Sequence, residues 1–255
     1  IHTTGIELAM NFRAHLESYS PDMRDGVWVE NITKHDNIFV IKAKSGDRDI
    51  TFKSKAVIIA TGVHPRELGV AGEQALRGRG VSYCTVCDGP LFGGKKVAVI
   101  GGGNSALESG LMLAGIASEV VIINKNSQFN GEQVLLDNLV KKPNVKIIYN
   151  AMTDSIHGDK EVTGISYSVD GKIEKIDIDG VFVHIGMIPN SALVTGLVKT
   201  NKFGEIEVDD HCQTSVEGLF SAGDVTNVPF KQIVIAAGQG CIALLSAVAY
   251  LNRIK

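Results

Sequence analysis

The spacing of hydrophobic positions changes several times along the chain, and each change marks a predicted element. Residues 5–20 place apolar side chains on one face at helical spacing, which predicts an amphipathic helix. From residue 27 to 60 the pattern becomes short β-rich runs separated by turn residues. The last run, AVIIATG, is continuously apolar, as is typical of a strand buried on both faces. The segment GVHPREL is predicted to be a linker, since Pro65 disfavours helix in the residue before it.

A second unit alternates strands with helices. Residues 95–126 predict a strand, a glycine turn, a helix and a strand, followed by a helix near residues 132–142 and the strand VKIIYN. A polar hairpin at about residues 162–178 precedes the buried strand GVFVHIG, and MIPN is a second linker candidate. The short strand GLFSAGD and a long helix from about Lys231 follow, and we expect this helix to be a buried core helix. This alternation predicts an α/β fold with parallel sheets.

Composition narrows the function classes. The 255 residues are 44% apolar and 21% charged, with a formal net charge of −3, which gives no support to a nucleic-acid surface. No secretory signal is visible, and no membrane role is expected. Four cysteines are too few for a disulfide scaffold and favour a reducing compartment, so we expect a cytoplasmic protein.

Residues 101–106 (GGGNSA) match the pattern G-x-G-x-x-A between a predicted strand and a predicted helix. In that context Gly101 permits a tight turn, Gly103 lets the backbone approach a pyrophosphate, and Ala106 permits close packing of helix on strand. The N–H groups at the helix start would then receive the phosphates. The alternative is a strand-to-helix turn without a ligand.

The choice of nicotinamide cofactor stays open. The end of the next strand usually carries an acid for a ribose hydroxyl or basic residues for a 2′-phosphate. Here it is Asn-Lys-Asn, so Lys125 could meet a 2′-phosphate or could be an ordinary solvated lysine. The sequence therefore allows NADPH and NADH equally.

Two of the cysteines, Cys84 and Cys87, lie in the segment SYCTVCDGP. A structural zinc site would need a second close pair of ligands, and the isolated Cys212 and Cys241 do not supply one, so no metal is expected. Chance, or a buried pair of free thiols, is the other alternative. A redox pair is favoured, because C-x-x-C spacing lets one thiolate attack a partner disulfide and the other resolve the mixed disulfide. Asp88 could protonate a departing thiolate or could cap a turn.

The acid in GLFSAGD ends a buried strand, where ligands bind in α/β sheets, although a turn-capping role explains it equally well. The helix that follows begins near Lys231 and continues in small residues that allow close approach to an aromatic ring. Cys212 and Cys241 are expected to be small core residues. His184 lies on a buried strand and is expected to be a core residue rather than a ligand.

Taken together, ATG, YCTVCDGP, VAVIGGGNSALE, GLFSAGD and KQIVIAAGQGC resemble the low-molecular-weight thioredoxin reductase family. This family includes the flavoprotein subunit of bacterial alkyl hydroperoxide reductase, to which CDGPLF, VPFKQI and LSAVAYL are more similar. The resemblance runs from about residue 27 to the end. It implies two Rossmann-like dinucleotide-binding domains of three-layer ββα type. An FAD domain (residues 1–64 and 189–255) would be split by an inserted NAD(P)H domain (residues 65–188) that carries the C-x-x-C pair.

The resemblance also implies roles for individual residues. Cys87 would lie nearer the flavin, Cys84 would attack the partner protein, and Asp88 would be the general acid. The residues matching FAD contacts are Thr61, Gly62, Gly223, Asp224, Lys231, Gln232, Ile233 and Ala236. The residues matching NAD(P)H contacts are Gly101, Gly103, Asn104, Ser105 and Glu108, with Lys125 as the open candidate for a 2′-phosphate.

The implied activity passes electrons from NAD(P)H through FAD and the cysteine pair to a thioredoxin-like or glutaredoxin-like protein disulfide. The alternative within the family is the reductase component of a peroxiredoxin system. Both the pair and the NAD(P)H turn must reach one flavin, which implies rotation about hinges near residues 62–66 and 186–190. A homodimer is implied by the resemblance alone.

Two departures from the family pattern matter. The N-terminal FAD βαβ unit with its G-x-G-x-x-G turn is absent, and the chain begins at Ile1, which favours a truncated chain with exposed apolar surface. The Asn-Lys-Asn stretch matches neither form of the cofactor site. A different class of function therefore stays open, namely a flavin-free, dinucleotide-binding fragment with a redox-sensing cysteine pair.

Overall fold

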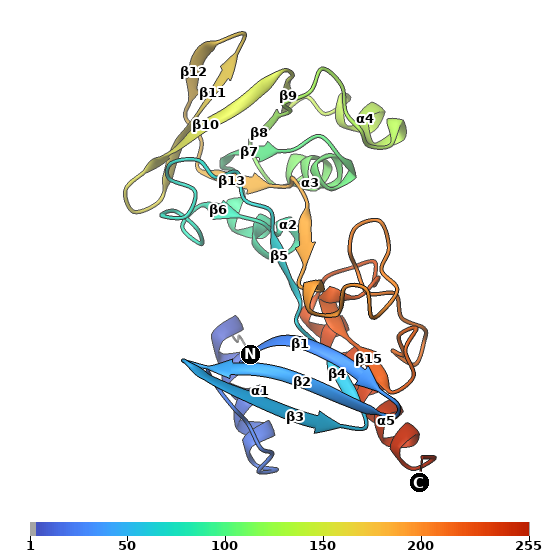
Figure 1. Ribbon diagram of the computed structural model, residues 1–255. Helices are drawn as coiled ribbons and strands as arrows, with labels where there is room; N and C mark the ends of the chain where they lie inside the picture. Colours follow the sequence, from blue (N-terminus) through green and yellow to red (C-terminus); the bar gives the residue numbers. More distant parts are fainter. Residues whose placement is uncertain (1–3, 255) are drawn as a thin grey trace. The chain divides into compact units, whose positions relative to one another are not determined.

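The structure is a computed structural model that describes residues 4–254. The chain divides into two compact units, which are described separately. Unit 1 is formed by Ile1–Gly62 and Pro189–Lys255, and unit 2 by Val63–Ile188. Both segments of unit 1 are therefore needed to build its core (Figure 1).

Unit 1 contains an antiparallel meander of order β1-β2-β3 and a two-stranded parallel sheet of order β15-β4. The core between them is made by side chains such as Ile32 and Phe39 from the meander and Ile59 and Leu219 from the parallel strands. The elements are α1 (Gly5–Glu17), β1 (Trp28–His35), β2 (Ile38–Ser45), β3 (Arg48–Ser54), β4 (Val57–Ile59), η2 (Ala192–Val194), β15 (Leu219–Ser221), η3 (Gly223–Val225) and α5 (Ile233–Leu251).

The predicted N-terminal helix forms as α1, but its apolar face is not covered. Thr4 begins it with a capping box, in which its hydroxyl accepts from the Glu7 N–H at 3.1 Å and its own N–H donates to the Glu7 carboxylate at 2.7 Å. No residue of α1 is buried, and Phe12 and Leu16 are about half exposed. Local capping therefore defines this helix, and no described element packs over its hydrophobic stripe.

The expectation of a strand buried on both faces at AVIIATG is wrong for the described residues. Only Ile59 of β4 is buried, while Ile58 is 36% exposed. The strand pairs with β15 along one edge and has no ladder partner on the other among residues 4–254. A strand is apolar at every position when other elements pack on both of its faces. In β4 the face that carries Ile58 has no such packing among the described residues.

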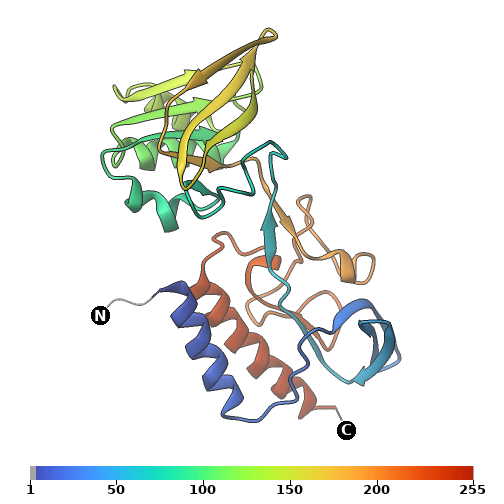
Figure 2. The same cartoon turned by 90° about the vertical axis from the view of Figure 1, so that its left-hand side faces the viewer.

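The long C-terminal helix α5 also forms as predicted but is not a buried core helix. Its buried residues are Ala243, Ala247 and Tyr250, which pack against Phe220 and Cys212. In its most apolar 18-residue window only 17% of residues are buried. The helix is long and apolar enough to cross a membrane, which by itself is weak evidence for a span. Figure 2 shows α5 (red) and α1 (blue) as the two long helices of unit 1.

Unit 2 is built around a parallel sheet of order β6-β13-β7-β8-β9. An antiparallel ladder of order β10-β11-β12 covers one face, and α3 and α4 cover the other (Figure 1). The elements are β5 (Val63–Pro65), β6 (Val81–Ser82), α2 (Thr85–Asp88), η1 (Gly89–Phe92), β7 (Lys96–Ile100), α3 (Asn104–Ala114), β8 (Glu119–Ile123), α4 (Gln133–Leu139), β9 (Val145–Ile148), β10 (Ala151–Gly158), β11 (Val162–Val169), β12 (Lys172–Ile176), β13 (Gly180–Val183) and β14 (Met187–Pro189).

The alternation of side chains along β7 produces the three layers. Val97 and Val99 pack with the helices, whereas Ala98 and Ile100 pack with the antiparallel ladder. This follows from the two-residue period of a strand, and it requires the four covered positions after Lys96 to be apolar because both faces are covered there. The three-layer ββα prediction is confirmed for unit 2.

One strand of unit 2 was not predicted, and the predicted linkers contain short strands. Residues 151–158 form β10, which pairs with β11, although the sequence suggested only a hairpin from residue 162. The two predicted linkers lie where the chain passes from one unit to the other, and they contain β5 and β14, which pair with each other as a short two-stranded ladder. Strands this short carry too little periodicity to be recognised from hydrophobic pattern alone.

Candidate functional site

Cys84 and Cys87 form a disulfide bond at the start of α2. The Cys84 sulfur caps this helix, because it accepts a hydrogen bond from the Cys87 N–H at 3.2 Å. Cys84 is half-buried and Cys87 is exposed. A donor aimed at the Cys84 sulfur stabilises negative charge there once the bond is opened, so the turn favours Cys84 as the thiolate.

Asp88 ends α2 and is joined to Cys84 through Ser82. The Ser82 hydroxyl donates to the Asp88 carboxylate at 2.6 Å and accepts from the Cys84 N–H at 3.1 Å. Ser82 is 6% exposed and Asp88 is half-buried. The structure therefore holds the predicted acid in fixed relation to the predicted attacking cysteine, and sequence reasoning did not identify Ser82.

The residues before the disulfide are held by a buried carboxylate. Glu73 is 1% exposed and accepts from the N–H groups of Leu68 and Gly69 at 2.9 and 2.7 Å. It also accepts from the Tyr83 hydroxyl at 2.9 Å, and burial together with this bond raises the pKa of Tyr83. Tyr83 precedes Cys84, so this cluster anchors the chain where it enters the disulfide turn.

Thr85, between the two cysteines, is tied to the core by a second polar cluster. Its hydroxyl lies 2.5 Å from the Ser109 hydroxyl and 2.8 Å from Nε2 of His184. Thr85 and Ser109 are 5% and 4% exposed. Burial lowers the pKa of the His184 imidazole to about 4, so the ring is neutral at neutral pH. His184 is thus hydrogen-bonded but half-buried, rather than the fully buried core residue that the sequence predicted.

We expect His184 to make folding stability depend on pH. The unfolded chain binds the imidazole proton near pH 6.5 and the folded chain only near pH 4, so stability is fully present above about pH 6.5 and falls as pH drops to about 4. The loss attributable to this ring reaches about 3 kcal/mol at most. Urea unfolding of the parent and of His184→Gln at pH 7.5, 5.5 and 4.5 measures it. If the parent and His184→Gln lose the same free energy of unfolding between pH 7.5 and 4.5, then His184 is not the group responsible for the pH dependence.

The glycine turn lies between β7 and α3. Gly101 has φ +150°, and a Cβ there would lie 2.2 Å from the His184 carbonyl oxygen, so only glycine fits. Gly103 is the N-cap of α3 without a side-chain cap, and a Cβ there would meet nothing within 4 Å. The helix start is therefore open on the side of Gly103. An anion can reach its free N–H groups, so the turn fits a dinucleotide phosphate.

The other predicted NAD(P)H residues surround this turn in different ways. Ser105 and Glu108 are exposed on α3, and Lys125 is exposed after β8. The Asn104 amide is engaged with Glu132, to whose N–H it offers an acceptor at 2.7 Å. Asn124 is fully buried, with its side chain bonded to the Asn126 N–H and the Gln128 carbonyl. The Asn124 side chain is used in hydrogen bonds within its own loop. Lys125, the next residue after the strand, is the side chain that faces solvent.

The predicted FAD residues gather in unit 1, where the structure leaves one acceptor unsatisfied. Asp224 lies in η3, and its Oδ1 atom is buried without a hydrogen-bond partner. A buried acceptor in this state costs about 1–3 kcal/mol unless a ligand satisfies it. Gly223, at φ +77°, allows the turn to approach Ala236 of α5. An acceptor without a donor at this turn fits a bound hydroxyl or amide group, as the FAD prediction requires.

Gln239 holds this turn, and sequence reasoning did not identify it. Its carbonyl oxygen accepts from the Gly223 N–H at 2.8 Å and from the Thr226 hydroxyl at 3.2 Å. Lys231 is anchored from the other side, since its ammonium group lies 2.8 Å from Glu205 and 2.7 Å from the Thr226 carbonyl. Lys231 therefore supports the loop before α5. Gln232 is half-buried, and Ile233 is exposed.

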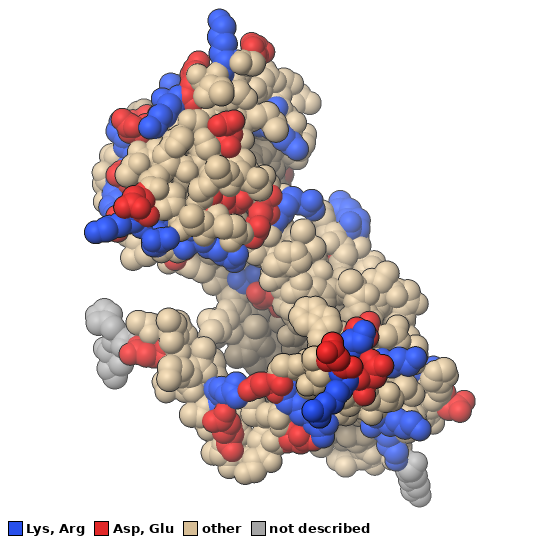
Figure 3. Space-filling view, turned by 60° about the vertical axis from the view of Figure 1, so that its left-hand side comes forward, with Lys and Arg blue, Asp and Glu red and all other residues tan. Residues whose placement is uncertain are grey.

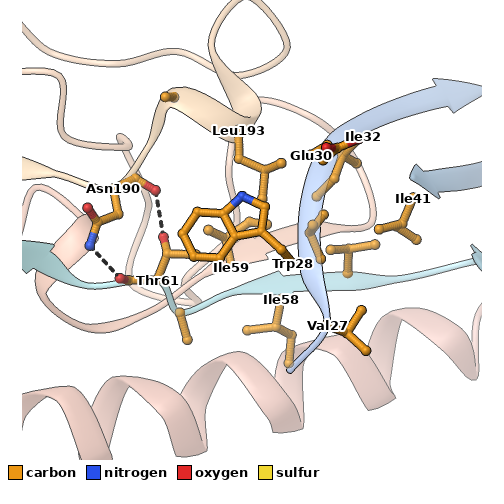
Figure 4. A pocket seen from close by; sticks show the side chains of 14 residues that line it. Val27, Trp28, Glu30, Ile32, Ile41, Ile58, Ile59, Thr61, Asn190 and Leu193 are labelled. Carbon is orange, nitrogen blue, oxygen red and sulfur yellow. Dashed lines mark hydrogen bonds between the residues drawn. The ribbon is translucent and has the colours of Figure 1, made fainter. Parts of the chain in front are cut away.

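A pocket of about 910 Å³ opens beside β4 in unit 1. Figure 4 shows Trp28, Ile58, Ile59 and Leu193 lining it. Thr61 and Asn190 are joined by two hydrogen bonds beside it, of 2.7 and 2.8 Å. Gly62 follows with φ +68°. The predicted FAD contact Thr61 thus lies at the margin of an apolar hollow that the hydrophobic pattern did not reveal.

The structure brings the predicted residues together in two groups, one in each unit. The cysteine pair, Asp88 and the glycine turn share unit 2, while the ATG and GD segments share unit 1. Among the described residues no cluster of histidine, cysteine or carboxylate side chains could hold a metal ion. Cys212 is buried as expected, but Cys241 is exposed, contrary to its predicted core position. In Figure 3 positive and negative side chains are interspersed on the face shown.

Comparisons with known proteins agree on one family. The family model described as "Pyridine nucleotide-disulphide oxidoreductase" matches residues 4–240. The chain is 42% identical to the F component of alkyl hydroperoxide reductase from Escherichia coli, over 99% of the chain and 49% of the relative. It is 43% identical to a protein named NADH dehydrogenase of Ferdinandcohnia aciditolerans, over 99% and 48% respectively. The chain spans about half the length of the curated relatives it matches.

Solved structures give the same result for the fold. Thioredoxin reductase from Streptococcus pyogenes matches with a TM-score of 0.90 at 33% identity, over 99% of this chain and 82% of the other. Thioredoxin reductase from T. acidophilum is 39% identical with the same coverage and a TM-score of 0.61. The expected resemblance to thioredoxin reductases and to the alkyl hydroperoxide reductase flavoprotein is confirmed.

Proposed function

The chain belongs to the pyridine nucleotide-disulphide oxidoreductase family, and from this we propose that it serves in reducing a protein disulfide with electrons from NAD(P)H. The observation that carries the proposal is the disulfide of Cys84 and Cys87, linked through Ser82 to Asp88. The enzyme is an oxidoreductase whose family uses FAD and NAD(P)H. FAD would supply the two-electron exchange between the nicotinamide and the disulfide.

The residues that would hold the cofactors lie on the two units. Asp224, with Thr61 and Gly62, would meet FAD, and the open start of α3 at Gly103 would receive the NAD(P)H phosphates. NADPH and NADH are both compatible with an exposed Lys125. The segments that pass between the units, around residues 62–66 and 186–190, would act as hinges.

The chemistry of the cysteine pair follows thiol–disulfide exchange. Once the pair is reduced, the Cys84 thiolate attacks one sulfur of the partner disulfide and displaces the other as a thiolate. Asp88 would give that leaving thiolate its proton. The Cys87 thiol, after losing its proton, attacks Cys84, which re-forms the Cys84–Cys87 disulfide and releases the partner as a dithiol. Two electrons and two protons have then passed from the pair to the partner.

The partner would be a thioredoxin-like or glutaredoxin-like protein disulfide. A second candidate, the reductase component of a peroxiredoxin system, is favoured by the 42% identity to the F component of alkyl hydroperoxide reductase. We also propose that the protein works in the cytoplasm as a homodimer. The contrasting hypothesis from another class is a flavin-free fragment that binds a dinucleotide and senses redox state through the pair.

The first test is a visible absorption spectrum of the purified chain with added FAD, before and after anaerobic NADPH or NADH. We expect a retained flavin spectrum that bleaches with at least one nucleotide, because the family chemistry reduces the flavin first. The nucleotide that bleaches faster identifies the donor. A protein that stays colourless after FAD is added and the excess is removed would contradict the FAD part of the proposal and favour the redox-sensing fragment.

A matched pair of variants tests the FAD contact itself. Asp224→Ala removes the buried acceptor and should release FAD during desalting, whereas Asp209→Ala changes an exposed aspartate of the same unit and should not. Retention of FAD by Asp224→Ala would show that Asp224 only shapes the turn.

A further inference from the structure

The two cysteines enclose a threonine whose hydroxyl faces the interior. Thr85 is 5% exposed and lies within hydrogen-bond distance of Ser109 on α3 and His184 just after β13. These three side chains come from three separate elements of unit 2. No step of the disulfide exchange uses the half-buried His184 or the buried Ser109, so their position next to the pair needs another explanation.

The geometry allows the Thr85 hydroxyl to be satisfied in either tautomer of His184. A hydroxyl offers one donor and two acceptor positions, and a neutral imidazole offers one of each. With Nε2 protonated, His184 donates to Thr85 and Thr85 donates to Ser109. With Nδ1 protonated, the direction of both bonds reverses. In either tautomer the Thr85 hydroxyl is held from two sides at 2.8 and 2.5 Å.

His184 also touches the other functional element of unit 2. Its N–H donates to the Ile100 carbonyl at 2.8 Å, and its own carbonyl occupies the space that a Cβ on Gly101 would need. One residue therefore packs its backbone against the glycine turn and its ring against Thr85, one of the two residues between the cysteines. The disulfide turn is connected through it to the base of the predicted dinucleotide turn.

The cluster matters most when the disulfide is open. The S–S bond then no longer holds Cys84 near Cys87. The two thiols stay close through the backbone of α2, the Cys87 N–H bond to the Cys84 sulfur, the contacts of Ser82 and the anchoring of Thr85. Holding reacting groups in place raises their effective concentration and favours bond formation. A firmly held turn should therefore make the pair easier to oxidise and harder to reduce.

We propose that His184 is a positioning residue which, through Thr85 and together with Ser109, holds the reduced Cys84–Cys87 turn closed and so sets its disulfide-forming equilibrium. The inference rests on the proposed redox role of the pair. It concerns the chain alone and requires neither FAD nor a partner protein, so it can fail while the proposed function stands.

The test measures the equilibrium between the pair and dithiothreitol. In each exchange the protein disulfide takes two electrons and two protons from one dithiol and leaves oxidised dithiothreitol. The purified chain is equilibrated over a series of reduced-to-oxidised ratios, and free thiols are then blocked by an alkylating reagent and counted by mass. Exposed Cys241 and buried Cys212 are replaced by serine and alanine in all samples, so that only the pair is counted.

His184→Ala and Thr85→Val should each shift the equilibrium toward the dithiol roughly tenfold, the effect of losing about one buried hydrogen bond. Tenfold corresponds to a potential about 30 mV less negative. His184→Gln, whose amide nitrogen can take the place of Nε2, should stay within about twofold of the parent. The double variant should shift no further than either single one, because both remove the same interaction.

A matched control separates positioning from general loosening. His157 makes an equivalent bond to the Ser166 hydroxyl at 2.7 Å between β10 and β11 of the same unit. His157→Ala should lower the melting temperature without moving the redox equilibrium.

Three results would overturn the inference. The first is an unchanged equilibrium in folded His184→Ala and Thr85→Val. The second is an equal shift in His157→Ala, which would mean that any loosening of unit 2 has this effect. The third is a parent pair that stays oxidised in excess dithiothreitol, which would overturn the redox role of the pair as well.

Discussion

Replacing Cys84 with serine is expected to lower turnover with a protein disulfide roughly a thousandfold or more, because a reaction that depends on one nucleophile loses most of its rate without it. The Cys84 sulfur is also the one that receives the Cys87 N–H at 3.2 Å, so its thiolate is the better stabilised of the two. The measurement is NAD(P)H oxidation with a thioredoxin-like protein as acceptor. Bleaching of bound FAD by NAD(P)H should persist, since that step precedes the pair.

The companion variant Cys87→Ser assigns the roles. It should lose turnover to the same degree but keep the attacking sulfur, so it should accumulate a mixed disulfide with the partner on a non-reducing gel. Cys84→Ser should accumulate none, and Cys241→Ser, on an exposed face of α5, should retain parental turnover. A mixed disulfide formed by Cys84→Ser alone would reverse the assignment of the two cysteines.

Unit 2 was the more predictable part of the fold because its signals are local and redundant. β7 is apolar at Val97, Ala98, Val99 and Ile100, and such a run needs cover on both faces, which the helices and the antiparallel ladder provide. The glycine turn is required by one contact, the His184 carbonyl against Gly101. The pattern G-x-G-x-x-A at residues 101–106 therefore predicts this close contact from the sequence alone.

Unit 1 was less predictable, because the same patterns are present without the cover that they require. Ile58 on β4 and Leu245 on α5 have the composition of interior residues but are 36% and 64% exposed. Hydrophobic periodicity states which face must be buried and says nothing about which segment buries it. The predictions of strand and helix were therefore correct in type, while the prediction that both are buried was wrong.

The polar clusters around the site could not be read from the sequence for a different reason. Ser82, Ser109 and Gln239 have no role of their own in the recognised motifs, and their partners lie 6, 24 and 16 positions away. A motif records residues whose spacing along the chain is fixed by one turn or one helix. Contacts between elements depend on packing, so the cysteines and glycines were found and the residues that hold them were not.

Asp88→Asn is expected to lower turnover roughly a hundredfold, within the usual range for loss of a general acid. In the parent chain the Ser82 hydroxyl lies 2.6 Å from the Asp88 carboxylate. Asparagine keeps the shape of this side chain and can still accept that hydrogen bond, but it has no acidic proton to give to a departing thiolate. The loss should fall on reduction of the partner and leave bleaching of FAD by NAD(P)H unchanged. Stopped-flow measurement of the two steps separates them.

Two further variants decide what Asp88 does. Asp154→Asn, which changes an exposed aspartate of β10, should retain parental rates in both steps. Ser82→Ala should give an intermediate loss of turnover, since the carboxyl group remains but is no longer fixed relative to Cys84.

If Asp88→Asn reduces the partner at the parental rate, then Asp88 only ends α2. The proton would then come from solvent through the small pocket of about 180 Å³ that Asp88 and Ser82 line. The geometry favours a loss of rate in Asp88→Asn, because a buried serine that links acid and cysteine is unnecessary for a residue that merely caps a turn.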